Sequence, residues 1–157
     1  MQLLVGIDLS DSTEKIVKKA AEIAKALSAK VWLVHAVKPE PADFYIGGQE
    51  SDAAGFDMDP QLFRDSLAKR FHGEHRQIQE IADQLRQTGL DTTALLVQGA
   101  AVEAMLDEAS KLDVDMIVVG SHGRGAMHQL LVGSVSEGVL HKSECPILVV
   151  PTHDRGS

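Results

Sequence analysis

Short apolar runs alternate with amphipathic stretches along the whole chain. Five runs rich in Val, Ile and Leu have the length and composition of buried strands, and they span residues 3–7, 30–37, 92–98, 115–120 and 145–150. Between the runs, apolar residues recur at helical spacing, which predicts helices over 16–27, from Pro60 to near Gly89, over 101–112 and over 134–142. The predicted order is therefore a strict alternation of strands and helices that begins and ends with a strand.

This alternation predicts the fold class. Nearly continuous apolar strands are typical of a parallel sheet that is covered on both faces. Right-handed crossovers through the helices then give a single-domain, doubly wound α/β fold. We expect it to occupy residues 1–152, with residues 153–157 as a flexible tail. Ligands of such sheets bind beyond the carboxyl ends of the strands, where the strand order reverses.

Three local features refine this prediction. Asp11 and Glu14 resemble a capping pair at the start of the first helix. Residues 38–59 are rich in Pro, Gly and Asp and predict a long loop of open function. The helix after this loop carries an apolar stripe of Leu62, Phe63, Leu67, Phe71, Ile78, Ile81 and Leu85.

Composition and charge exclude several classes of function. The chain of 157 residues has 15 Lys and Arg against 23 Asp and Glu, for a net charge of −8. This balance argues against binding to nucleic acid or to anionic lipid. No apolar run is long enough to span a bilayer, and Asp8 comes too early for a signal peptide. Cys145 is the only cysteine, so no intramolecular disulfide can form. We expect a cytoplasmic protein that is not embedded in a membrane.

The glycine-rich stretch "GSHGRGAMHQLLVGSVSE", residues 120–137, follows the fourth apolar run and is the main candidate for chemistry. The Walker pattern G-x-x-x-x-G-K-[ST] fails, because Gly120 and Gly125 are followed by Ala126 and Met127 in place of Lys and Ser or Thr. The dinucleotide pattern G-x-G-x-x-G fails as well.

Catalytic and metal interpretations of the same stretch are also weak. The nucleophile elbow G-x-S-x-G nearly occurs around Ser136, but Ser134 stands in place of its first glycine and no strand ends just before it. His122 and His128 have no clear acidic or thiol companions, whereas zinc sites use three or four ligands. These histidines are better explained as surface or hydrogen-bonding residues, as are His72 and His75.

An anion site built from the backbone remains. Gly120 and Gly123 allow a tight turn with exposed amides, and Gly133 and Ser134 open a helix whose first amides have no partner. Ser134 and Ser136 add hydroxyl donors. Two alternatives stay open: Arg124 either adds positive charge or is a solvated loop residue, and the whole stretch could be only a glycine-rich connector.

The spacing Gly120-x2-Gly123-x9-Gly133-Ser134 resembles that of the ATP-binding branch of the universal stress protein family. Residues 5–24, 31–37, 115–125 and 145–151 are also similar to strands and helices of that family, so the resemblance covers Gln2 to Pro151. It implies a sheet of order 3-2-1-4-5 and ATP as the ligand. It implies ATP-contacting residues at Ile7, Asp8, Val37, Gly120, Gly123, Arg124, Gly133, Ser134, Val135 and Ser136.

Within this set the resemblance assigns different parts of ATP to different residues. Ile7 and Asp8 lie on the nucleoside side, Val37 offers backbone to adenine, Gly120 and Gly123 line the ribose and phosphates, and residues 133–136 hold the phosphates. Asp8 is also a candidate to place Mg²⁺, which hard oxygen ligands favour; no other metal ligand is expected.

The resemblance implies an ATP-binding regulatory or stress-response protein that acts through nucleotide-dependent binding to partners. Some relatives act beside membrane transporters, so a transporter is one class of target. A homodimer or higher homo-oligomer is expected through the apolar edge at residues 146–151. The alternatives are a slow ATPase on the same scaffold and an adaptor with a vestigial nucleotide site. No catalytic residue is expected, because the predicted cradle lacks an evident general base or arginine finger.

Overall fold

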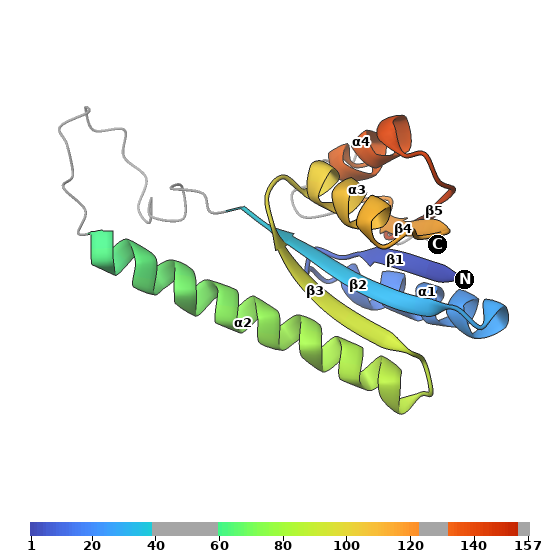
Figure 1. The fold of residues 1–157 in the computed structure, drawn as a ribbon, viewed down its shortest axis with the longest axis horizontal. Coiled ribbons are helices and arrows are strands. Elements are labelled where there is room, and N and C mark those ends of the chain that lie inside the picture. The colour runs from blue at the N-terminus through green and yellow to red at the C-terminus, as the bar shows by residue number, and fades with distance from the viewer. Residues whose placement is uncertain (39–59, 123–131, 154–157) are drawn as a thin grey trace.

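The computed structural model describes residues 1–38, 60–122 and 132–153 (Figure 1). The long predicted loop lies outside these residues except for Lys38, and so do Gly123, Arg124 and His128. The strands are β1 (Gln2–Gly6), β2 (Lys30–Val37), β3 (Thr92–Gln98), β4 (Met116–Gly120) and β5 (Ile147–Val150). The helices are α1 (Thr13–Leu27), α2 (Pro60–Gln87), α3 (Ala101–Lys111) and α4 (Ser134–Lys142).

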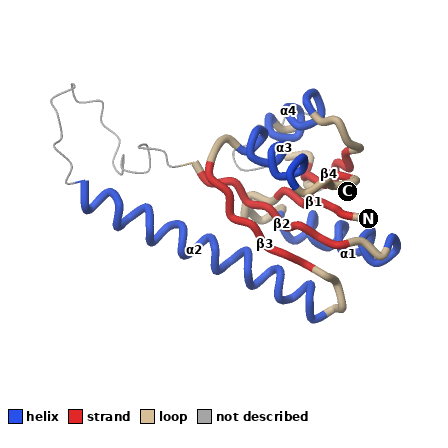
Figure 2. The backbone as a smooth tube through the Cα atoms, viewed as in Figure 1, coloured by secondary structure: helices blue, strands red, loops and turns tan. Residues whose placement is uncertain are grey.

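The five strands form one parallel sheet of order β3-β2-β1-β4-β5, as predicted. The tube in Figure 2 shows each strand connected to the next through a helix. The chain winds from β1 outward to β3 and then crosses back to β4 and β5. The strand order therefore reverses between β1 and β4, which is where sheets of this kind place their ligand sites.

Both faces of the sheet are covered by helices. Odd-numbered residues of β1 and β2, such as Leu3 and Leu33, pack on α1 and α2 through Ile16 and Ile78. On the other face, Leu4 and Ile117 pack against α3 and α4. Because successive side chains of a strand point to opposite faces, these continuous apolar strands serve both cores at once.

The start of α1 differs from the predicted capping pair. Ser12 is the N-cap residue and makes no side-chain capping hydrogen bond, so Asp11 and Glu14 do not form a capping box. Asp11 lies one residue too early, in the turn that precedes the helix. The side chains of that turn bond to one another instead, since the Ser10 and Ser12 hydroxyl oxygens are 2.8 Å apart.

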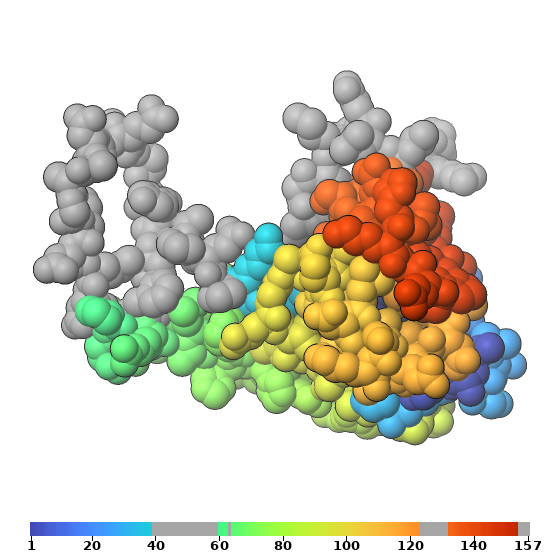
Figure 3. All heavy atoms as spheres, turned by 45° about the horizontal axis from the view of Figure 1, so that its top comes forward, coloured from blue at the N-terminus to red at the C-terminus, as the bar shows by residue number. Residues whose placement is uncertain are grey.

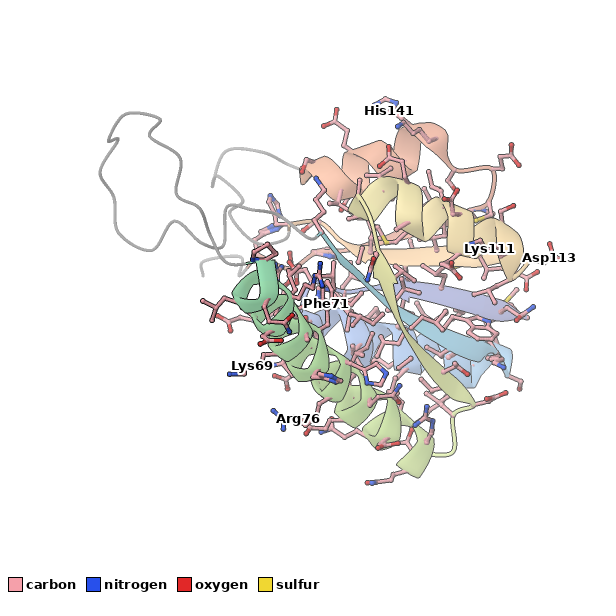
Figure 4. The ribbon with its side chains drawn as sticks, turned by 60° about the vertical axis from the view of Figure 1, so that its left-hand side comes forward. Lys69, Phe71, Arg76, Lys111, Asp113 and His141 are labelled. Atoms are coloured by element: carbon pink, nitrogen blue, oxygen red, sulfur yellow. The ribbon has the colours of Figure 1, made fainter. Side chains whose placement is uncertain are left out.

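Helix α2 begins at Pro60 and ends before Gly89, which has a φ of +90°. Among its described side chains, those in the second half of the apolar stripe reach the core, where Ile78 is fully buried. Leu62, near the other end, is 63% exposed. Figure 1 shows this first half projecting past the sheet, and in Figure 4 Phe71 points toward the body of the protein while nearby charged side chains point away. The predicted helix is confirmed, but its stripe is only partly a core stripe.

Candidate functional site

The carboxyl ends of β1 and β4 lie side by side, because Val5 pairs with Val118 in parallel register. Ile7 and Asp8 follow β1 directly, and Gly120 is the last residue of β4. The structure thus brings three of the sequence-predicted site residues to the point where the strand order reverses. Ile7 is buried, at 6% exposure, whereas Asp8 is only half-buried and lies at the rim.

A tight turn carries Asp8. Its Oδ1 accepts hydrogen bonds from the Ser10 amide at 3.0 Å and from the Ser10 hydroxyl at 2.5 Å. Between them, Leu9 has a φ of 58°, in the left-handed region that costs a non-glycine residue about 1–2 kcal/mol. Such strained backbone persists only where its surroundings fix it, and it is concentrated at functional sites.

The start of α4 faces the end of β4. The Gly133 amide donates to the Ser121 carbonyl at 2.5 Å, and the Ser136 hydroxyl donates to the Gly120 carbonyl. The first helical hydrogen bond is that of the Glu137 amide to Gly133. The amides of residues 134–136 therefore have no partner within the helix, which leaves a set of donors at the start of α4.

The two serines at this end of α4 have different surroundings. Ser136 is 3% exposed and its hydroxyl is bonded to Gly120, so it ties α4 to β4. Ser134 is exposed, and within the described residues its hydroxyl forms no hydrogen bond. Of the two hydroxyls predicted to meet phosphate, the Ser134 hydroxyl is the more accessible one. Val135 is 38% exposed.

Packing accounts for Gly120. A Cβ at this position would lie 2.7 Å from Ile16 Cδ1 and 2.9 Å from Thr152 Cγ2. Its φ is not in the left-handed region, so the tight turn that the sequence suggested at this glycine is not the reason for it. The absence of a side chain allows α1 and the residues after β5 to approach the end of β4.

Val37 is the last residue of β2 and is 1% exposed. Its carbonyl accepts a hydrogen bond from the Gly99 amide at 3.0 Å. A carbonyl oxygen has two lone pairs, so this hydrogen bond leaves one of them unused. The backbone contact of Val37 with adenine stays a prediction.

The histidine that first suggests a metal, His122, is held by neighbouring polar groups. Its Nδ1 is 3.0 Å from the Ser121 hydroxyl, and its amide donates to the Thr152 hydroxyl at 3.1 Å. Its ring meets that of His153 edge to face, with centroids 5.6 Å apart. Across residues 1–38, 60–122 and 132–153, no three His, Cys, Asp or Glu side chains converge as a metal site would require. His72 and His75 are exposed, as predicted.

One polar residue at this end of the sheet was missed from the sequence. His35 is 8% exposed, and its Nδ1 lies 2.9 Å from the Ile7 carbonyl oxygen. Its Nε2 lies 3.4 Å from Glu74 Oε2 on α2. The sequence held one indication of its role: His35 is a titratable residue within the apolar run 30–37. It alternates with Val31 and Leu33, so it lies on the same buried face of the strand.

Helices α3 and α4 lie against each other on the outer face of the site, where Figure 3 shows their surfaces in contact. Lys142 Nζ and Glu103 Oε1 are 2.9 Å apart. The hydrogen bond from Lys142 lowers the pKa of the Glu103 carboxyl below its ordinary value. Both groups are exposed, so this pair contributes little to stability, because solvent screens such interactions.

The opposite end of the sheet has a hollow with a volume of about 480 Å³. Its lining comes from Met1, the end of α1, the start of β2 and the turn between α2 and β3, and includes Lys25, Lys30 and Asp91. It lies at the amino ends of the strands, where doubly wound sheets do not place their ligands. We therefore place the candidate site at the carboxyl ends.

Comparison with known proteins identifies the family. The model of the family described as "Universal stress protein family" matches residues 1–151. The chain belongs to the universal stress protein family. Universal stress protein A homolog 2 of Coxiella burnetii is 33% identical over 150 residues, covering 95% of this chain and 93% of the relative. Universal stress protein MJ0577 of Methanocaldococcus jannaschii is 26% identical over 156 residues, covering 95% of this chain and 93% of the relative.

Solved structures agree with this assignment of the fold. A structure of MJ0577 superposes with a TM-score of 0.78 at 22% identity, covering 98% of this chain and 96% of the other. A universal stress protein in complex with cAMP gives a TM-score of 0.64 at 27% identity, with 98% of both chains covered. In the part of this universal stress protein that the structure describes, no helix is both long and apolar enough to cross a membrane.

Proposed function

We propose that this universal stress protein binds ATP between the carboxyl ends of β1 and β4 and the start of α4. The observation that carries the proposal is the set of amides at residues 134–136, which are unpartnered within the helix. Ser136 holds this helix start against the end of β4, and the neighbouring strand β1 leads into the Asp8 turn. A related universal stress protein, 27% identical, has been solved in complex with cAMP. This relative supports a nucleotide as the ligand class, and the glycine spacing of the sequence favours ATP among nucleotides.

The phosphates are proposed to meet α4. A helix start offers unbonded amides and the positive end of the helix dipole, which together attract phosphate. The interaction is worth about 0.3–1 kcal/mol when exposed and up to about 2 kcal/mol when partly buried. The Ser134 hydroxyl adds a donor, while Ser136 holds the helix start against Gly120. Gly123 and Arg124 complete the proposed phosphate contacts from outside the described residues.

A Mg²⁺ ion fits this arrangement when most of its ligands come from the nucleotide. Mg²⁺ is usually bound by one or two carboxylates together with phosphate oxygens and water. Asp8 is a single carboxylate at the rim, and one of its oxygens is directed to Ser10. A bound ion would offset the repulsion between this carboxylate and the triphosphate.

The proposed role is regulation by nucleotide-dependent binding to partners. The groups of α4 that face the proposed phosphates are backbone amides and a hydroxyl, which bind an anion without activating a nucleophile. The target enters this proposal through the family resemblance alone, with a membrane transporter as one class.

Equilibrium dialysis against ATP and Mg²⁺ tests the proposal. We expect saturable binding of one ATP per chain and phosphate release no faster than in buffer. Absence of saturable binding by the folded protein would overturn the proposed function. Turnover that exceeds the buffer rate and tracks the protein concentration would replace it with the slow ATPase.

We further propose a homodimer through β5, which is the free edge next to β4. Its Ile147, Leu148 and Val149 are partly exposed, and prolines at 146 and 151 flank it. An apolar edge strand of this kind favours pairing with a second copy. Light scattering on the purified chain is expected to give twice the monomer mass, and a monomer mass at micromolar concentration would contradict the proposal.

A further inference from the structure

The side chain of His35 connects the candidate site to α2. In β2 the residues of one face alternate as Val31, Leu33 and His35. The first two pack in the core beneath α1 and α2, and His35 takes the place of a third apolar residue at the site end. A buried polar side chain is stabilised only when its polar atoms are bonded, so its partners indicate its role.

The first partner of His35 is the backbone that enters the Asp8 turn. The paired register of β1 and β2 ends at Gly6, and the Ile7 amide adds one more hydrogen bond to Val34 at 2.9 Å. The next carbonyl, that of Ile7, lies 2.9 Å from His35 Nδ1. A carbonyl oxygen only accepts, so Nδ1 carries a hydrogen and donates. The ring thus holds β1 where the strand leaves the sheet.

The second partner of His35 is Glu74 on α2. Its Oε2 lies 3.4 Å from His35 Nε2, within ion-pair distance, and this buried oxygen forms no hydrogen bond in the described part of the chain. The other oxygen, Oε1, is 3.3 Å from Arg70 Nε. The Glu74 carboxylate therefore lies against the edge of the ring that faces away from Ile7 and limits how the ring can turn.

These contacts bear on the strained turn at the site. Leu9, two residues after Ile7, has a φ of 58°, a conformation that persists only where the surrounding structure holds it. Ser10 supplies one anchor through Asp8 Oδ1. His35 supplies a second anchor, on the other side of Leu9, through the Ile7 carbonyl. Release of either anchor would allow the turn to relax and move Asp8.

We propose that His35 is a positioning residue for nucleotide binding, which holds the Asp8 turn through the Ile7 carbonyl and is itself oriented by Glu74. This inference rests on the proposed nucleotide site. It adds that α2, which carries none of the predicted ATP-contacting residues, contributes to nucleotide affinity by orienting the ring.

Two amide substitutions separate the two contacts of the ring. The side-chain nitrogen of Asn can take the place of Nδ1, so His35→Asn keeps a donor for Ile7 and loses Glu74. The longer Gln places its amide near Nε2, so His35→Gln loses the Ile7 contact. We expect His35→Gln to bind ATP about tenfold more weakly than the parent, and His35→Asn to bind at least about fivefold more tightly than His35→Gln. Glu80→Gln is the control, because Glu80 is exposed on α2, the helix that carries Glu74. Its ATP affinity should equal that of the parent.

The measurements are equilibrium dialysis with ATP and Mg²⁺ and amide spectra of the nucleotide-free proteins. In His35→Gln the Asp8 and Ser10 amide resonances should move, while those of residues 134–136 stay. If His35→Gln does not fold, the pair Glu74→Ala and Glu74→Gln takes its place. We then expect Glu74→Ala to bind ATP at least about threefold more weakly than Glu74→Gln.

Three outcomes overturn the inference. Equal affinity of the parent and His35→Gln would remove the positioning role and leave the proposed function intact. Equal losses in His35→Asn and His35→Gln, with resonances moved throughout the site, would show a general structural role instead. A parent protein that does not bind ATP would overturn both the proposed function and this inference.

Discussion

Replacement of Gly133 by Asp is expected to weaken ATP binding severely without unfolding the protein. Gly133 is the N-cap residue of α4 with φ −74° and ψ 161°, a conformation open to any residue. Aspartate is among the preferred N-cap residues and satisfies an amide of the first turn, so stability should stay equal or rise by a few tenths of a kcal/mol. Its carboxylate would, however, occupy the proposed phosphate position.

The expected loss of affinity is at least about a hundredfold. Two like charges about 4 Å apart near a protein surface repel by about 4 kcal/mol, and about 1.4 kcal/mol corresponds to a factor of ten. Gly133→Asn is the matched control, because it has the same shape and capping ability without the charge, and it should bind at least about tenfold more tightly than Gly133→Asp. Equilibrium dialysis gives both affinities, and thermal unfolding confirms that both variants are folded.

Two results would contradict the assignment of the phosphate position. ATP binding by Gly133→Asp at the parent affinity would mean that phosphate does not contact the start of α4. Equal losses in Gly133→Asp and Gly133→Asn would attribute the effect to the size of the side chain rather than to its charge. Added salt should reduce the difference in ATP affinity between the two variants, because it screens the repulsion between the introduced carboxylate and the phosphates.

The second large effect is expected along α2. Ile78→Ala should lower the free energy of unfolding by about 2–5 kcal/mol, the usual range for truncating a fully buried isoleucine. Leu62→Ala, in the same helix, should change it by no more than about 0.5 kcal/mol, because Leu62 is 63% exposed. Urea denaturation of the two variants measures both values.

This pair distinguishes a helix that is buried along its length from one that projects. A cost of several kcal/mol for Leu62→Ala would contradict the projecting arrangement and indicate that the first half of α2 is covered in solution. A small cost for Ile78→Ala would contradict the packing of α2 on the sheet.

The sequence predicted the fold because its signals were redundant. Each of the runs 30–37 and 92–98 matches its strand at both ends, and the helix over 134–142 also matches. A strand boundary differed from its prediction where the apolar run continued past the hydrogen-bonded part of the sheet. At Ile7, for example, the carbonyl is bonded by the His35 side chain. The apolar stripe of α2 was wrongly expected to be buried along its whole length. Helical periodicity shows which face of a helix is apolar, but it does not show how far along the helix the sheet extends.

The candidate site could be predicted in outline but not in its contacts. Glycine and serine spacing located the start of α4, since unpartnered amides follow from any helix start. That Ser136 is directed to Gly120, and that Gly120 is required by Ile16, depends on how α1, β4 and α4 approach one another in space. His35 was missed because its partner Glu74 is 39 residues away along the chain, beyond the reach of local patterns.

The central claim, that ATP binds at the carboxyl ends of the strands, is tested most directly by amide spectra recorded during a titration with ATP and Mg²⁺. We expect the largest saturable shifts at Asp8, at Ser10 and over residues 134–136. Shifts confined to the hollow at the opposite end, around Ser28, Lys30 and Gly89, would contradict the account, and so would a spectrum that ATP leaves unchanged.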